Sequence, residues 1–364
     1  MTEPADLLLF GSGAFAARIA FDIAATATQP VRVVIAGRNA VRRDWLRVAA
    51  NARAANFGRP ATFLAHAVDL SIPDAADEAI LAYRPKVVVQ AATTQTSAVI
   101  SGQKDAWGQL VSEGGLGITA VFNALFSSRV ASALNKAGSK AHFVNCGFPD
   151  VVNSLLAALG LPITCGFGNV AILATAFAGE HGIRAPGRLK VLAHYETIGA
   201  WRRPTEERAG MPAARVWIDD IEVPDIYSAF RGVKLTPEPV IDISGATGVP
   251  LILAMIAGSE WQGHAPGPNG LPGGYPVALR KGVLDLDLPT AIKRSEAIAW
   301  NARFEAENGL AVDGAGQARY SGRLYQKLRA VSPALAEGFS VSDIETVHKE
   351  MEALRAKLQG RLAS

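Results

Sequence analysis

The stretch Leu7-Leu8-Leu9-Phe10-Gly11-Ser12-Gly13-Ala14-Phe15-Ala16 joins an apolar run to a turn that carries two glycines. Residues 17 to 24 continue with bulky apolar side chains at helical spacing. In a strand, turn and helix with this G-x-G-x-x-A pattern, Gly11 permits the tight turn, Gly13 lets a ligand approach the backbone, and Ala16 keeps the helix near the sheet. The stretch therefore predicts a buried strand followed by an anion-binding turn and a helix.

A second strand follows and ends Ile35-Ala36-Gly37-Arg38-Asn39. This order of elements resembles the first unit of Rossmann-fold NAD(P)-dependent oxidoreductases, which implies a pyrophosphate on the amides of residues 14–16. Proteins that bind NAD usually end this strand with a carboxylate, whereas Gly37, Arg38 and Asn39 stand here. A guanidinium binds a 2'-phosphate, so we expect NADP(H), although Arg38 could also be a solvated arginine. Arg42 and Arg43 could enlarge the phosphate site.

Other cofactor contacts are expected at the carboxyl ends of later strands, because ligands bind there in open parallel sheets. Asp69 ends a strand over 62–70 and is a candidate adenine contact, or a capping or turn residue. The strand over 85–92 places Ala91, Ala92 and Thr93 beside the cofactor. Asn145 ends the strand over 141–146 and is available at the nicotinamide end.

Two family resemblances extend this interpretation. The end of the second strand and Val68-Asp69-Leu70 resemble saccharopine-dehydrogenase-like reductases, within the nucleotide-binding half. The order of elements from 118 to 169 resembles the lactate/malate dehydrogenase family. The catalytic aspartate and substrate-binding arginine that this second resemblance implies fall near Ile172 and Thr175, so 2-hydroxy acid chemistry is disfavoured.

A reductase needs a proton donor near the carbon that accepts hydride, and His, Tyr and Lys are the usual donors. His194 lies in an expected strand with Glu196 on the same face, which lines a cleft or meets solvent. His264 and Tyr275 lie in a segment over 263–276 with four prolines and five glycines, which we expect to be irregular. That segment is a substrate-binding loop or a structural crossover. Our catalytic candidates are His264, His194 and Tyr275.

Other residues are assigned lesser roles. His66 and His142 are expected to pack inside strands, and His348 to be exposed in an amphipathic tail. Cys146 follows a strand and precedes a helix, as the nucleophile of semialdehyde dehydrogenases does, but a packed thiol is the simpler interpretation. The glycine-rich segment 94–117, with Trp107 and Lys104, is a lid over the nicotinamide or an ordinary surface excursion.

Composition limits the class of protein. The 364 residues include 49% hydrophobic and 19% charged residues, so disorder is not expected. The net charge of +3 is not gathered in basic blocks, which argues against nucleic acid as a partner. We expect no membrane span, no secretory signal and no metal site. Two cysteines fit a reducing compartment, so a cytoplasmic location is expected.

The expected fold class is α/β, with an N-terminal Rossmann parallel sheet and a second α+β domain carrying a mixed or antiparallel sheet. The expected domains are 1–183 for NADP(H), 184–335 for substrate and dimerisation, and 336–364 as a helix against the nucleotide domain or a partner. Arg184, Arg188, Arg202 and Arg203 offer anion contacts. The leading hypothesis is a homodimeric NADPH-dependent oxidoreductase that reduces a carbonyl or imine of a small metabolite. The alternatives are a noncatalytic NADP(H) sensor or scaffold and an acylating semialdehyde-type dehydrogenase using Cys146.

Overall fold

A six-stranded parallel sheet in the order β3-β2-β1-β4-β5-β6 forms the centre of the computed structural model, which describes residues 3–96, 105–235 and 241–360. Its strands are short and mostly buried because their side chains are almost all apolar. The strand order reverses between β1 and β4, and ligands bind at such a switch point in open parallel sheets. The strands are β1 (Leu7–Phe10), β2 (Val31–Gly37), β3 (Ala61–Ala67), β4 (Val87–Gln90), β5 (His142–Asn145) and β6 (Cys165–Gly166).

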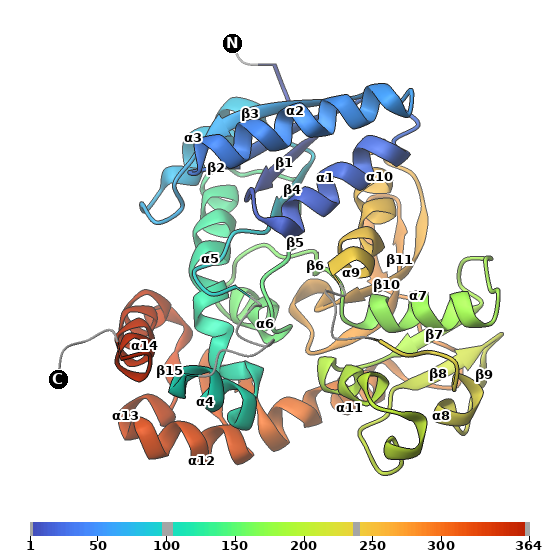
Figure 1. Cartoon of the computed structure of the whole chain (residues 1–364), viewed down its shortest axis with the longest axis vertical. Coiled ribbons are helices and arrows are strands. Elements are labelled where there is room, and N and C mark those ends of the chain that lie inside the picture. Colours follow the sequence, from blue (N-terminus) through green and yellow to red (C-terminus); the bar gives the residue numbers. More distant parts are fainter. Residues whose placement is uncertain (1–2, 97–104, 236–240, 361–364) are drawn as a thin grey trace.

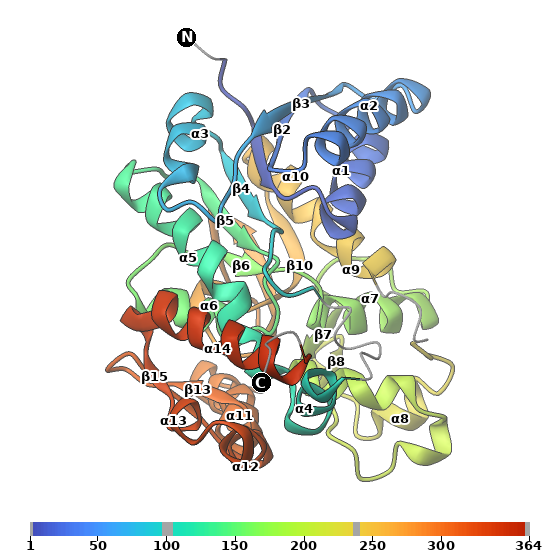
Figure 2. The same ribbon diagram turned by 60° about the vertical axis from the view of Figure 1, so that its left-hand side comes forward.

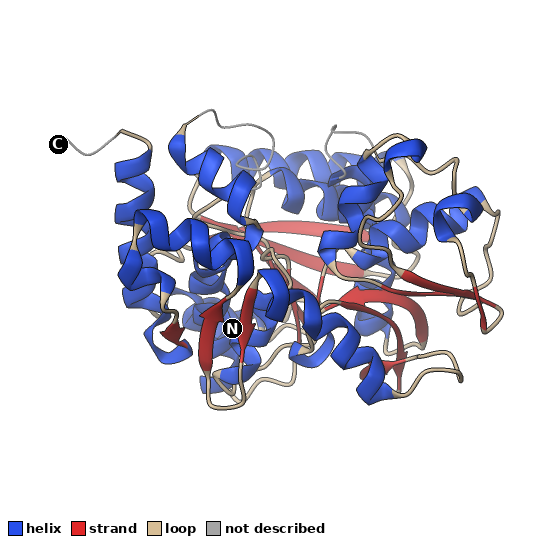
Figure 3. Ribbon diagram, turned by 90° about the horizontal axis from the view of Figure 1, so that it is seen from below, coloured by secondary structure: helices blue, strands red, loops and turns tan. Residues whose placement is uncertain are grey.

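Helices cover both faces of this sheet (Figures 1 and 3). One apolar cluster joins one face to α1, α2 and α10, and another joins the opposite face to α3 and α5. This three-layer arrangement confirms the expected Rossmann-type architecture of the N-terminal part. The helices are α1 (Ala14–Thr26), α2 (Ala40–Asn56), α3 (Ala75–Tyr83), α5 (Ala120–Lys136) and α10 (Val249–Ala257).

The continuous helical stretch Leu116–Lys136 is long and apolar enough to cross a membrane by length and composition, and it consists of η2 (Leu116–Thr119) and α5. In the structure 78% of its apolar window is buried inside the protein. Helices in the core of a globular protein pass the same test, and α5 packs between the sheet and the C-terminal helices.

Beyond β6 the strands of the described residues form three antiparallel sheets of three strands each, which confirms the expected α+β character of this part. The strands are β7 (Leu189–Leu192), β8 (Arg215–Ile218) and β9 (Ile221–Glu222); β10 (Trp261–Pro266), β11 (Gly274–Arg280) and β12 (Val283–Leu286); and β13 (Leu310–Val312), β14 (Gln317–Tyr320) and β15 (Phe339–Ser340). The further helices are α4 (Ala106–Gly114), α6 (Val151–Ala158), α7 (Val170–Glu180), α8 (Ile226–Ala229), α9 (Ile241–Thr247), α11 (Arg294–Asn308), α12 (Gly322–Val331), α13 (Pro333–Ala336) and α14 (Ile344–Leu358), with 3-10 turns η3 (Tyr195–Arg202), η4 (Thr205–Glu207), η5 (Pro268–Gly270) and η6 (Val341–Asp343).

The apolar core is continuous across residue 183, the expected domain boundary. Side chains of β1 and α1 belong to the same buried cluster as α10, β10 and β11. A backbone pair between Ala193 and Gly274 further links β7 to β11. The division at residue 183 therefore stays a prediction.

The segment 263–276 is irregular only in its middle: its two ends belong to strands β10 and β11, and residues 267–273 form the connection between them. β10 and β11 pair in antiparallel register, with His264 opposite Pro276 and Pro266 opposite Gly274. Pro266 lies in β10, an edge strand of its sheet, where proline does least harm. Gly267, Gly270 and Gly273 adopt positive φ angles in the connection that contains η5.

Two further expectations are corrected. The sequence predicts a strand around residues 240 to 243, but helix α9 begins at Ile241; residue 240 itself lies outside the described residues. Of the expected lid over 94–117, residues 97–104, with Lys104, also lie outside them. Trp107, which the lid interpretation would place toward a substrate, is fully buried in α4 among α5, α12 and α14.

The tail helix α14 lies along α5 (Figure 2). His348, expected to be exposed, is 5% exposed, lies edge-on to Phe122 and is 2.9 Å from the hydroxyl of Thr94 through Nε2. Arg129 of α5 pairs with Glu345 of α14 at 2.9 Å. The charged residues of the tail thus cover one face, and the other face belongs to the core.

Candidate functional site

The glycine turn lies at the carboxyl ends of β1 and β4. Gly11 has a φ of +124°, and a Cβ there would lie 3.1 Å from the carbonyl carbon of Ala91 and the nitrogen of Ala92. Only glycine meets both conditions without strain. Gly13 is exposed, and a Cβ there would meet nothing within 4 Å, so the space above it is open.

Helix α1 begins directly at this open space. Gly13 is its N-cap, no side chain within residues 3–96, 105–235 and 241–360 caps the helix, and no acidic residue occupies the first turn. The first-turn amides of Ala14, Phe15 and Ala16 therefore need an external acceptor, which an anion supplies best. The residues present fit a pyrophosphate.

Arginines surround the end of β2. Arg38 is 69% exposed in its side chain and lies 3.8 Å from the carboxylate of Asp69. Arg42 donates from Nε to the carbonyl of Ser12 at 3.1 Å, and Arg43 donates from Nη1 to the carbonyl of Gly37 at 3.0 Å. The glycine turn is thus bordered by three guanidinium groups.

Asn39 and Asp69, the other residues expected to contact the adenosine, lie next to these arginines. Asn39 caps α2 by accepting from the amide of Arg42, so its side chain has a structural role. Asp69 accepts two hydrogen bonds from Ser71, which together with Arg38 lower the pKa of Asp69. Asp69 is therefore an anion beside Arg38. Its bonds to Ser71 stabilise a turn, which is the alternative role that the sequence offered for Asp69.

The side chain of Gln90, the last residue of β4, fixes the backbone that follows the strand. Gln90 accepts from the amide of Ala92 at 3.0 Å and donates to the carbonyl of Ala92 at 2.7 Å. Thr93 accepts from the amide of Gln95 and donates to its carbonyl. Residues 91–93 therefore form a rigid, partly exposed edge beside the glycine turn.

Asn145 is 1% exposed and has no free polar group, contrary to the expectation that it is available to the nicotinamide. Its Oδ1 accepts from Ser127 at 2.8 Å and from the amide of Gly147 at 2.9 Å. Its Nδ2 donates to Asn153 at 2.8 Å. The side chain orients the loop between β5 and α6.

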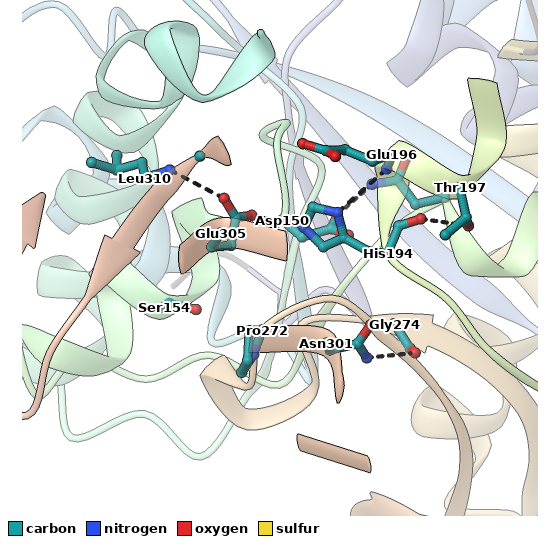
Figure 4. A network of polar contacts seen from close by, with 12 residues as sticks. Asp150, Ser154, His194, Glu196, Thr197, Pro272, Gly274, Asn301, Glu305 and Leu310 are labelled. Carbon is teal, nitrogen blue, oxygen red and sulfur yellow. Dashed lines mark hydrogen bonds and ion pairs between the residues drawn. The ribbon is translucent and has the colours of Figure 1, made fainter. Parts of the chain in front are cut away.

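That loop leads to a buried charged cluster, shown in Figure 4. His194 is 1% exposed, and its Nε2 lies 2.9 Å from Oε1 of Glu305 on α11. The imidazole also stacks on Phe304 with ring centroids 4.8 Å apart. Burial opposes a positive charge on His194, but the carboxylates of Glu305 and Asp150 outweigh it and raise the pKa. His194 and Glu305 thus hold a proton between Nε2 and Oε1.

The expected strand around His194 ends at Leu192, because residues 195–202 turn into η3. His194 caps η3, with Nδ1 accepting from the amide of Glu196 at 3.4 Å, so the two side chains do not share a strand face. This contact assigns the Nε2 proton to the bond with Glu305. Glu305 also accepts from the amide of Leu310 at 3.2 Å.

Asp150 follows the loop after β5 and precedes α6. It is 4% exposed; Oδ1 accepts from the side chain of Asn169, whereas Oδ2 has no hydrogen-bond partner in the part of the chain that the structure describes. Burial raises the pKa of Asp150 to about 6, although the nearby charge of His194 opposes this shift. A buried carboxylate oxygen without a partner is costly and calls for a role.

His264 and Tyr275 do not join this cluster. His264 accepts from the amide of Val191 at 2.9 Å through Nε2, and burial lowers its pKa to about 3. Tyr275 is fully buried and donates to the carbonyl of Pro272 at 2.7 Å. His264 links β10 to β7, and Tyr275 links β11 to the connection before it, so neither is suited to donate a proton.

Cys146 and the expected anion contacts are not arranged for chemistry either. Burial raises the pKa of the Cys146 thiol well above its ordinary value, which disfavours a nucleophilic thiolate. Arg188 pairs with Asp219 and Arg203 with Glu207 at the surface, and Arg184 and Arg202 are exposed.

Sequence reasoning missed Asp150 and Glu305. The sequence predicts a helix after Asp150 and a helix over 290–307 that includes Glu305, but it assigns neither acid a functional role. The available signal was a single acid among apolar helix positions, since Glu305 lies next to Phe304 and four residues after Asn301, which is also buried.

Neither the protein-family models nor the curated proteins searched contain a match to this chain. Solved structures do match its fold. A lactate dehydrogenase from a Medee basin deep-sea metagenome library has a TM-score of 0.51 at 12% identity, over 96% of this chain and 99% of that one. A Cryptosporidium parvum lactate dehydrogenase with lactic acid and NAD has a TM-score of 0.48 at 14% identity, over 97% and 99%. The first likeness shows a shared fold.

Proposed function

We propose that this chain is an NADPH-dependent oxidoreductase that transfers hydride to a carbonyl or imine carbon of a small metabolite. The carrying observation is that the uncapped start of α1 opens at the same edge of the sheet from which the loop to Asp150 leaves. A bound nicotinamide would supply the hydride. The protein would supply a proton from His194, which Glu305 orients at 2.9 Å.

The choice of NADPH rests on the arginines beside the glycine turn. A guanidinium that is mostly exposed, as in Arg38, can rotate to a 2'-phosphate, and Arg42 and Arg43 add positive charge. When the cofactor binds, Asp69 would release Arg38 and accept a hydrogen bond from the ribose instead. The dehydrogenase of similar fold supports a dinucleotide site only by analogy.

We test the cofactor with Arg38→Asp. Losing a charged hydrogen bond and adding a repelling carboxylate should weaken NADPH about 30-fold or more and leave NADH within about threefold. Fluorescence titration of each cofactor measures both. Arg231→Asp, at an exposed arginine far along the chain, makes the same charge change and should alter neither affinity. Equal losses for both cofactors would overturn the phosphate assignment.

The proposal also includes a cytoplasmic homodimer. Both cysteines are free, which agrees with a reducing compartment. Sedimentation of the full chain tests the dimer. Binding of NADPH and NADP+ without turnover of any carbonyl or imine substrate would instead favour a sensor.

A further inference from the structure

We propose that the cluster around His194 recognises a positively charged group of the substrate, such as a protonated amine, and excludes carboxylates. This inference rests on the proposed function, because it names the substrate class of the same site. It concerns binding by Asp150 and Glu196, whereas His194 and Glu305 handle the proton.

The first observation is the free acceptor on Asp150. Its side chain is 4% exposed, and Asn169 occupies only Oδ1. Oδ2 has no partner among the described residues. A buried carboxylate oxygen left in this state is stabilised best by a donor that also carries positive charge. An ammonium group offers three such donors, and a carboxylate offers none.

The second observation is the balance of charge. The carboxylates of Asp150, Glu196 and Glu305 all raise the pKa of His194. Glu307 is a further acid, and it raises the pKa of Glu196. Arg323 is the one guanidinium that acts on Glu196 within this set, and burial raises the pKa of Glu196. No hydrogen bond from the described residues occupies the Glu196 carboxylate. The cluster therefore has an excess of negative charge in a mostly buried place.

The third observation concerns the arginines that a carboxylate would need. Arg188 and Arg203 are paired at the surface with Asp219 and Glu207. In α7, Ile172 is buried in the apolar core and Thr175 donates to the carbonyl of Ala171. A substrate carboxylate would thus meet three like charges, and the one guanidinium that acts on this cluster, that of Arg323, is exposed and acts on Glu196.

A small-ion probe separates the two ligand charges. The full chain carries ¹³C,¹⁵N-labelled histidine, the ring signals of His194 are assigned with His194→Asn, and spectra are recorded with and without NADP+. Butylammonium chloride should shift the His194 signal with saturation, whereas sodium butyrate should match sodium chloride at equal ionic strength. A larger response to butyrate, or none to butylammonium, would overturn the proposal.

Variants locate the binding group. Asp150→Asn should weaken butylammonium binding at least tenfold, and Glu196→Gln should weaken it several-fold without disturbing the buried contact to Asn169. Glu260→Gln, at an exposed acid, is the control and should change nothing. Unchanged affinity in both site variants would also refute the assignment.

The outcomes remain separable from the proposed function. The cation site is built from protein groups alone, so the probe reports on it without cofactor, and a separate fluorescence titration reports NADPH binding. Failure of NADPH to bind would remove the oxidoreductase proposal and leave the cation result standing. NADPH binding together with a preference for butyrate would remove only the cation site.

Discussion

Asp150 couples the stability of the protein to pH. Its pKa rises from 3.8 to about 6 on folding, so the folded chain binds this proton more tightly than the unfolded chain does. The associated stability is present below pH 4 and is lost as the pH rises through 6. At pH 8 the folded protein therefore keeps an unfavourable buried charge.

Asp150→Asn removes that charge and keeps an oxygen for Asn169. We expect the free energy of unfolding to rise by roughly 1 to 3 kcal/mol at pH 8 and to change little at pH 4. Urea denaturation at both pH values measures this. The exposed Glu260→Gln is the control and should have no effect at either pH. If Asp150→Asn raised the free energy of unfolding equally at both pH values, the titration of Asp150 would not be the cause.

Glu305 sets the proton affinity of His194. Glu305→Gln removes a charge 2.9 Å from Nε2, so the pKa of His194 should fall because burial then acts with less opposition. Histidine NMR titration measures the shift. Glu307→Gln changes an exposed acid on the same helix and should have a much smaller effect. Similar pKa values in both variants would contradict the pairing.

The two glycines in the turn between β1 and α1 are expected to have different roles: Gly11 in the stability of the fold and Gly13 in cofactor binding. Gly11→Ala places a Cβ 3.1 Å from the backbone of Ala91 at a φ of +124°, so we expect about 1 to 3 kcal/mol of destabilisation. Gly13→Ala meets open space at a φ of −75°. It should keep stability within about 1 kcal/mol and weaken NADPH at least tenfold.

Thermal unfolding and NADPH titration of both variants measure this contrast. The two changes add the same methyl group two residues apart, so each is the control of the other. Full NADPH affinity in Gly13→Ala would mean that no ligand approaches this part of the backbone.

Elements with a local signal could be predicted from the sequence, and elements fixed by distant partners could not. The strands before Gly11 and Gly37 follow from apolar runs and glycine turns. The hairpin of β10 and β11 does not, because its prolines and glycines argue against strands; Pro276 lies opposite His264 and beyond the residues of β11 that pair with β12. The same limit hid the site: Glu305 and His194 are 111 residues apart in sequence and meet only in the folded chain.

At the scale of the whole molecule, the C-terminal helix completes a core that includes α5 of the Rossmann layer. Trp107, Phe122, Leu324 and Met351 belong to one buried cluster drawn from α4, α5, α12 and α14. Residues 344–358 therefore contribute to the stability of the sheet-bearing part, and their loss should affect the whole chain.

Met351→Ala tests this integration. Met351 is fully buried, so the cavity should cost about 2 to 5 kcal/mol in a single cooperative transition. The neighbouring exposed Glu350→Ala should stay within about 0.5 kcal/mol. Urea unfolding followed by tryptophan fluorescence and by far-UV circular dichroism measures both variants. If α14 were an arm that leaves the chain for a partner subunit, the cost of Met351→Ala would depend on protein concentration; we expect the same cost at all concentrations, because Met351 packs within its own chain.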